Sequence, residues 1–310
     1  MNPLKNILNS VLRTPGQKLN LLVAPFNGFT ELMLEKTGHK IFYLPNAKYK
    51  FNPKTSVIVV NDIVSMPGDI VIDAVICNDR VVQYDVCLNI ARALHVPLVV
   101  VEHYHPDNML HRDDLKYLRL NQVRSEYIPT QISINKAWDE VGDVIPYGIE
   151  ARDINRGDGV LSVGNFSPMD TINITQTFAP HRTLVYNLEQ QTIPINDEVY
   201  TCCDIYANLC QHNMIPIPML EAMSYGIPAV SIKNTVLASL FEHEKNIFFC
   251  EDIGQIANTI KLLKSQGGRS ALERVGNNGR ELVRTQFNLE TYINLCNIQL
   301  NKVTQKGYLL

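Results

Sequence analysis

The residues with the clearest potential for chemistry lie in the stretch 213–228, Asn-Met-Ile-Pro-Ile-Pro-Met-Leu-Glu-Ala-Met-Ser-Tyr-Gly-Ile-Pro. Pro218 suits the first position of a helix, where a missing N–H costs nothing, and Gly226 suits the left-handed residue that ends one. The unpaired N–H groups at the start of a helix bind anions. The stretch therefore predicts a site for an anionic ligand, with the Glu221 carboxylate on the same helix.

A second group of polar side chains, His103 and His105, directly follows the apolar run 96–102. Such a run is typical of a buried strand, and ligands bind at the carboxyl edge of strands in open α/β sheets. Two imidazoles could chelate a metal, but a His-x-His pair without a nearby third ligand is more often not a metal site. The sequence also lacks Cys-x2-Cys and Asp-x-Asp spacing, so we expect no metal.

The rest of the chain must supply elements that position these residues. Unbroken apolar runs such as 97–101 indicate strands covered on both faces, as in a parallel sheet, and the amphipathic stretches between them indicate helices. The alternation predicts an α/β protein with Rossmann-like, doubly wound sheets. Strands are expected within 19–24, 40–44, 56–60, 70–76, 96–102, 130–134, 159–168, 181–186, 199–209, 227–232 and 246–250. Helices are expected within 29–37, 81–94, 111–124, 236–243, 252–264, 268–286 and 289–302.

Length and composition limit the architecture. A chain of 310 residues most naturally forms two domains of about 150 residues, each with its own core. Pro146 and Gly148 favour a turn, so we expect the domains to be 1–150 and 151–310. No apolar run is long enough to cross a bilayer and the N-terminus lacks a signal-peptide pattern, which predicts a cytoplasmic protein. The seven cysteines lie mostly in apolar runs, which suits reduced thiols.

Charge is unevenly distributed along the chain. Residues 1–54 contain eight basic and two acidic side chains, although the whole chain has a net charge of −3. Such a segment is usually a solvated face, and its functional alternative is attraction to an anionic surface, either lipid or nucleic acid. An amphipathic helix expected over 4–12 adds the alternative of peripheral membrane contact.

The stretch 218–230, Pro-Met-Leu-Glu-Ala-Met-Ser-Tyr-Gly-Ile-Pro-Ala-Val, resembles the signature of group 1 (family 4-like) glycosyltransferases. Residues 143–150 and 159–168 resemble two further segments of that family. The resemblance implies a GT-B fold, with two Rossmann-like domains facing each other across a cleft. It also implies an N-terminal acceptor domain, a C-terminal domain that binds a nucleotide-sugar, and final helices that pack back on the N-terminal domain. The implied reaction is transfer with retention of anomeric configuration and without a metal.

The resemblance also implies roles for particular residues. Glu221 matches the glutamate that holds the donor ribose, and Asn213 falls where a catalytic glutamate faces the donor sugar. His103 matches a histidine at the end of a strand in the acceptor cleft. The donor is expected to be a UDP- or GDP-sugar, and no other cofactor is implied. The residues implied for donor binding are Glu221, Gly164, Asn165, Pro218 and Gly28.

The chain departs from the family pattern where charge is needed. Asn165 and Asp170 stand where the family has an Arg and a Lys that clamp the donor diphosphate, and Asn213 replaces a glutamate. A departing nucleotide needs cations to stabilise its charge, so these changes put the usual catalytic arrangement in doubt.

Three functions therefore stay open from the sequence. The first is a glycosyltransferase that acts on a hydroxyl of a glycan or lipid-linked sugar. The second is a transferase that acts on hydroxymethylated bases in DNA, which the basic segment 1–54 favours. The third is a catalytically degenerate partner or sugar-binding protein, which Asn165, Asp170 and Asn213 favour.

Overall fold

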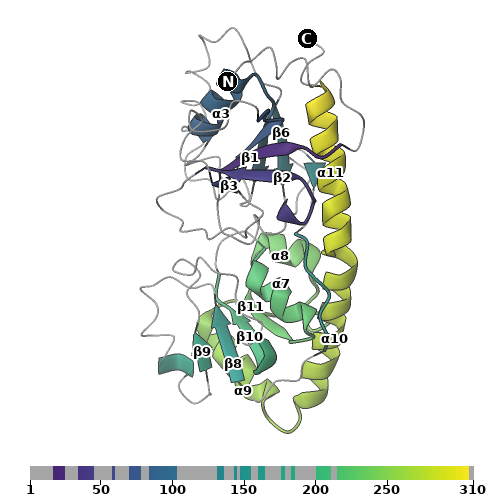
Figure 1. Cartoon of the computed structure of the whole chain (residues 1–310). Coiled ribbons are helices and arrows are strands. Elements are labelled where there is room, and N and C mark those ends of the chain that lie inside the picture. Colours follow the sequence, from purple (N-terminus) through teal and green to yellow (C-terminus); the bar gives the residue numbers. More distant parts are fainter. Residues whose placement is uncertain are drawn as a thin grey trace. The chain divides into compact units, whose positions relative to one another are not determined.

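Figure 1 shows the chain as a computed structural model. Two compact units emerge, one made of Met1–Ile145 together with Tyr292–Leu310 and the other of Pro146–Thr291. The assignment of acceptor and donor roles to the two units stays a prediction. The structure describes residues 17–24, 34–44, 58–59, 70–77, 84–102, 131–135, 143–144, 147–154, 160–164, 176–178, 183–185, 200–210 and 215–306.

The first unit is built on a parallel sheet of seven strands in the order β3-β2-β1-β4-β5-β6-β7 (Figure 1). Strands β1 to β3 are added outward on one side of the sheet, and β4 to β7 are added outward on the other side. All strands stay parallel, and the topological switch point lies between β1 and β4. The strands are β1 (Asn20–Ala24), β2 (Lys40–Tyr43), β3 (Ile58–Val59), β4 (Ala74–Cys77), β5 (Leu98–Glu102), β6 (Gln131–Asn135) and β7 (Asp143–Val144).

The core of the first unit explains why its strands are unbroken apolar runs. Every residue of β4 is buried, as are the last four of β1 and the last three of β2. Helix α3 (Tyr84–Leu94) places its apolar face on the sheet, with Cys87, Leu88 and Ala91 in the shared core. Parallel sheets need cover of this kind on both faces. The predicted helix 81–94 is confirmed from Tyr84 onward.

The turn that leads into β2 contains a left-handed glycine followed by a partly buried histidine. Gly38 adopts the left-handed conformation, with φ of 79°, as expected for the residue that ends the preceding helix. The next residue, His39, accepts the Leu19 N–H at Nδ1 over 3.2 Å. Burial lowers the pKa of the His39 imidazole, and the positive charge of Lys18 acts in the same direction. The folded state therefore favours neutral His39.

This histidine predicts a loss of stability in acid. Because the pKa of His39 is lower in the folded than in the unfolded protein, its contribution is fully present above the unfolded pKa, about 6.5, and is lost as pH falls below it and through the lower folded pKa. Urea unfolding at pH 7.5 and pH 5.5 should show a larger acid loss for the natural chain than for His39→Asn. An equal loss in both proteins would contradict the assignment.

The second unit has its own parallel sheet, of five strands in the order β12-β11-β10-β8-β9 (Figure 1). Its strands are β8 (Val160–Gly164), β9 (Thr183–Val185), β10 (Cys203–Asn208), β11 (Ala229–Ile232) and β12 (Phe248–Cys250). Its helices include α7 (Ile217–Ser224), α8 (Thr235–Leu240), α9 (Ile253–Leu263) and α10 (Arg269–Gln286), and α11 (Leu289–Lys306) runs from the end of this unit into the first. The predicted mixed α/β class with parallel sheets is confirmed.

Side-chain caps fix where two of these helices begin. The Asn234 side chain accepts the Leu237 N–H over 2.8 Å and starts α8, and the Asp252 side chain accepts the Gln255 N–H over 2.8 Å and starts α9. We expected Asp252 inside the first turn of its helix, and this was wrong by one position because its carboxylate caps the helix from outside.

Other differences concern element ends. The helix expected over 236–243 ends at Leu240, and the strand expected over 70–76 begins only at Ala74 and ends at Cys77. Strand β7 was not expected, because two residues beside a turn carry no periodic signal, and its pairing with β6 is a tertiary contact. None of the helices in the described part of the chain combines the length and apolar character that a bilayer crossing requires.

Candidate functional site

The second sheet has a natural ligand-binding position between β8 and β10. From β8 the chain moves to β9 on one side, then returns to β10 on the other side and continues to β11 and β12. Ligands of open α/β sheets bind outside the carboxyl ends of the strands at such a reversal. The residues that end β8 and β10, and the helix that follows β10, therefore define the candidate site.

The strand ends at this position are held tightly together. The Gly164 carbonyl, at the end of β8, accepts the Leu209 N–H over 3.1 Å. A side chain at Gly164 would overlap the Tyr206 hydroxyl, so only glycine fits beside this tyrosine. Asn208, fully buried at the end of β10, donates from Nδ2 to the Ser231 hydroxyl over 2.7 Å. These contacts make the edge that faces a ligand rigid.

Helix α7 starts at this edge. Pro216 is its N-cap, and Pro218 occupies the second helical position, not the first as we expected. The difference has little physical effect, because the second N–H also lacks an intrahelical partner. Gly226 follows the helix with φ of 80°, as predicted for the residue that ends it.

Glu221 is distinguished from the rest of α7 by its exposure. In this fully described helix the other seven residues are buried, and Glu221 alone is partly exposed. The Tyr200 hydroxyl donates to Glu221 Oε2 over 2.8 Å. Because Tyr200 is almost completely buried, it orients the carboxylate from the protein side. Glu221 is therefore a positioned acceptor on an otherwise buried helix.

Tyr200 is in turn held by an aromatic and cationic stack. Its ring lies on Tyr225, with centroids 5.5 Å apart and an interplanar angle of 25°. The Arg152 guanidinium lies over the Tyr225 ring, 5.7 Å from its centroid. The same guanidinium forms an ion pair with the Glu150 carboxylate over 3.2 Å. Arg280 donates from Nε to the Arg152 carbonyl over 3.2 Å. These contacts connect Glu150 and Arg152 to the end of α7 and to α10.

Of the predicted site residues, Glu221, Gly164 and Pro218 are described, and they belong to the two elements that flank the reversal between β8 and β10. Their predicted roles stay predictions. The other predicted residues, Gly28, His103, Asn165 and Asn213, lie outside the described residues, as do the expected helices 4–12 and 111–124. Among the described residues, no three His, Cys, Asp or Glu side chains are grouped so that they could hold a metal.

The sequence analysis missed the residues that support Glu221. Tyr200 lies 21 positions before Glu221, and no local pattern connects the two. Asn208 offered a weak signal, because an amide within an apolar strand run must find partners when it is buried. Polar residues in predicted buried strands are therefore worth testing as site residues.

Comparison with known proteins relates this geometry to one family. Residues 190–282, which include β10, α7, α8, α9 and most of α10, match the model for "Glycosyl transferases group 1". No curated protein sequence is significantly similar to the chain.

Solved structures with the same fold are distant in sequence. The HepE protein of Anabaena, in complex with UDP-glucose, is 15% identical, with a TM-score of 0.64 over 91% of this chain and 98% of that chain. The sucrose-phosphate synthase of Thermosynechococcus elongatus is 10% identical, with a TM-score of 0.63 over 92% and 99%. A glycosyltransferase from Rickettsia africae is 11% identical, with a TM-score of 0.60 over 94% and 100%. These similarities confirm the predicted GT-B fold.

Proposed function

We propose that the protein transfers a sugar from a nucleotide-sugar to a hydroxyl group of an acceptor, on the premise that residues 190–282 match the model for group 1 glycosyltransferases. The observation that carries the proposal is Glu221, a partly exposed carboxylate held by Tyr200 on an otherwise buried helix at the reversal of the sheet. Two vicinal hydroxyls of a ribose are suitable donors to such a carboxylate.

In this proposal the second unit binds the donor. At the start of α7, Pro218 has no N–H, and the Met219 and Leu220 N–H groups donate to the Pro216 carbonyl. We therefore assign the Ile217 N–H to the diphosphate, and Glu221 accepts hydrogen bonds from the ribose. A UDP- or GDP-sugar is the proposed donor, and the bound UDP-glucose of the Anabaena protein with the same fold supports a uridine nucleotide. Gly164, which ends β8, and Asn165, the next residue in the sequence, are the residues proposed to contact the diphosphate.

Retention of anomeric configuration and metal independence are part of the proposal. A sequence without Asp-x-Asp supports charge stabilisation by a helix N-terminus and cations. Asn213 would orient the donor sugar through its amide, and His103 would line the acceptor cleft. Because Asn213 is uncharged, we expect it to position hydroxyls and not to stabilise positive charge at the anomeric carbon.

A thermal-shift screen tests the donor proposal. UDP, GDP, ADP and the corresponding glucose conjugates should be compared, since a ligand that binds only the folded state raises the melting temperature. We expect a uridine or guanosine diphosphate to raise it and expect UDP- or GDP-sugar to be consumed in the presence of acceptor. No shift with any nucleotide would contradict the proposal. Binding without hydrolysis or transfer would establish the degenerate binding protein that Asn165, Asp170 and Asn213 also suggest.

Tyr200→Phe should weaken nucleotide binding through Glu221. The change removes the hydroxyl that holds Oε2, and a hydrogen bond of this kind contributes roughly 0.5–1.5 kcal/mol. We expect the dissociation constant of the effective nucleotide to rise severalfold at a temperature where the variant is folded. Tyr292→Phe, a buried tyrosine on α11, is the matched control and should leave the constant unchanged. If both variants bind the nucleotide normally, Tyr200 has only a packing role.

A further inference from the structure

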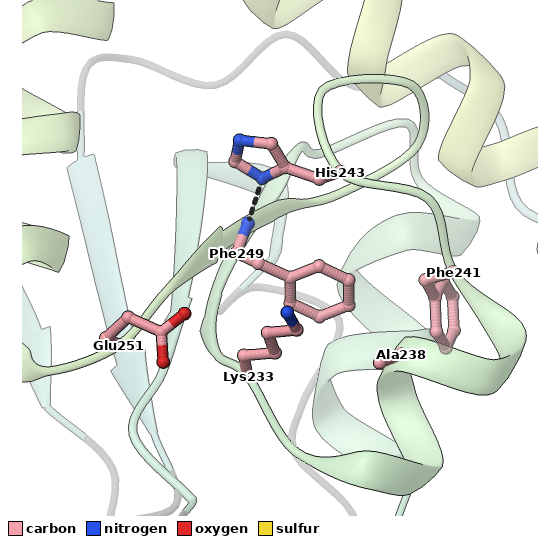
Figure 2. Close-up of a pocket in the computed structure, with 6 residues that line it drawn as sticks. All are labelled: Lys233, Ala238, Phe241, His243, Phe249 and Glu251. Carbon is pink, nitrogen blue, oxygen red and sulfur yellow. Dashed lines mark hydrogen bonds between the residues drawn. The ribbon is translucent and has the colours of Figure 1, made fainter.

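A pocket of about 390 Å³ lies at the carboxyl edge of the second sheet, beside the strand that follows α7. Figure 2 shows its lining residues, which come from the position after β11, from α8 and the turn after it, and from β12 and the residue that follows it. This volume is within the range of sites that take small molecules. The six lining residues are Lys233, Ala238, Phe241, His243, Phe249 and Glu251.

The pocket has an apolar base that is held in place. Phe241 is buried and stacks on Phe287, with centroids 6.2 Å apart and an interplanar angle of 4°. Phe249 is partly buried and lies nearly parallel to the His243 ring, at 6.4 Å and 14°. With Ala238, these side chains present aromatic and aliphatic surface to a ligand, and neighbouring rings fix their orientation.

A backbone contact sets the chemistry of His243. Its Nδ1 accepts the Phe249 N–H over 2.9 Å, drawn as the dashed line in Figure 2. A neutral imidazole that accepts at Nδ1 carries its proton on Nε2. His243 therefore carries a hydrogen-bond donor at Nε2, on a side chain that is 54% exposed and with Glu244 Oε1 3.7 Å away.

Lys233 and Glu251 place opposite charges around this base. The Lys233 N–H donates to the Cys250 carbonyl over 2.9 Å, and the Glu251 N–H donates to the Gln255 side chain over 3.0 Å, so both backbones are fixed. Neither charged group makes a hydrogen bond or ion pair with any residue that the structure describes. The ammonium donors and carboxylate acceptors of these two side chains are thus available to a ligand.

This combination favours one class of ligand. An anion such as phosphate would suit Lys233 but would be repelled by Glu251, and a quaternary ammonium would meet the reverse conflict at Lys233. A wholly apolar group would leave the polar groups around the base unused. A neutral sugar ring satisfies all of them, because its C–H face packs on aromatic rings while its hydroxyls both donate and accept.

We propose that this pocket binds one ring of a neutral saccharide. None of its lining residues is among those proposed for the donor or the acceptor, so the inference goes beyond the proposed function. Ser231 of β11 pairs in register with Asn208 of β10, and Lys233 follows two residues later. Neighbouring strands lie about 5 Å apart, so the pocket adjoins the proposed donor edge within the same unit.

The test uses methyl glycosides of glucose, galactose, mannose and N-acetylglucosamine as probes for the natural chain. Saturation-transfer NMR detects their binding, and amide shifts of His243 and Phe249 locate it. We expect at least one glycoside to bind and to shift these amides. Lys233→Met and Glu251→Gln should each weaken that glycoside about tenfold, as expected for a lost hydrogen bond to a charged group. Lys245→Met and Glu281→Gln change exposed charges that do not line the pocket and should bind normally.

Several results would overturn the inference. Failure of all four glycosides to shift the His243 and Phe249 amides would do so, as would normal binding in both pocket variants. A stronger response to inorganic phosphate or choline would assign the pocket to a charged ligand. Thermal shifts with UDP and GDP on the same proteins separate the two proposals. Nucleotide binding without glycoside binding contradicts only the pocket, and glycoside binding without nucleotide binding contradicts the transferase function and leaves a saccharide-binding protein.

Discussion

Gly276→Ala is expected to lower the free energy of unfolding by about 2 kcal/mol. Gly276 lies inside α10, where alanine would gain about 1 kcal/mol in helix propensity. Its added Cβ, however, would overlap the Gly226 carbonyl oxygen and would lie 3.2 Å from Pro228 Cδ. Neither group can rotate away, because one is backbone and the other belongs to a proline ring. Overpacking of this kind costs about 1–3 kcal/mol or more, which outweighs the gain.

Two other glycines provide controls for this prediction. Gly267→Ala places its Cβ in open space and should change stability little. Gly279→Ala meets the Met223 Cε at 2.9 Å, the end of a flexible side chain, and the Asn246 carbonyl oxygen at 3.0 Å. Both contacts are less severe than the overlap with the Gly226 carbonyl oxygen, so we expect a smaller loss than at Gly276. Urea unfolding followed by circular dichroism measures all three. If the Gly276 and Gly267 variants were equally stable, α10 would be able to move away from the end of α7 without lowering the free energy of unfolding.

Glu221→Ala is expected to weaken binding of the effective nucleotide by roughly 1–3 kcal/mol, the scale of hydrogen bonds to a charged group. The proposed ribose loses its acceptor, and the Tyr200 hydroxyl loses its partner as well. Isothermal titration calorimetry with UDP or GDP gives the change directly. Normal affinity in a folded Glu221→Ala protein would contradict the ribose assignment.

A conservative change separates charge from shape at this residue. Glu221→Gln keeps a carbonyl oxygen that can accept from Tyr200 but removes the negative charge. We expect nucleotide affinity between those of the natural chain and the alanine variant. Glu281→Gln, which neutralises an exposed carboxylate on α10, is the matched control and should bind the nucleotide normally. If Glu281→Gln weakens nucleotide binding as much as Glu221→Gln does, the loss of affinity reflects the net charge of the protein and not a contact with Glu221.

The sequence by itself determined the elements whose signals are local. Unbroken apolar runs in β1 and β5 specified buried parallel strands, since side chains covered on both faces leave no alternation. The start and end of α7 followed from Pro218 and Gly226 for reasons of backbone geometry alone. The signature around Glu221 also indicated the family, because the helix that carries it is encoded by contiguous residues.

The tertiary structure decided everything that depends on residues far apart in the chain. Strand β7 exists only because β6 pairs with it, and Asp252 is a cap because of where the chain enters α9. The contact of Tyr200 with Glu221, and the meeting of Lys233, His243 and Glu251 around one pocket, join segments that no sequence period relates. Hydrophobic spacing reports which face of an element is buried, whereas the partner on that face is chosen by strand order and packing.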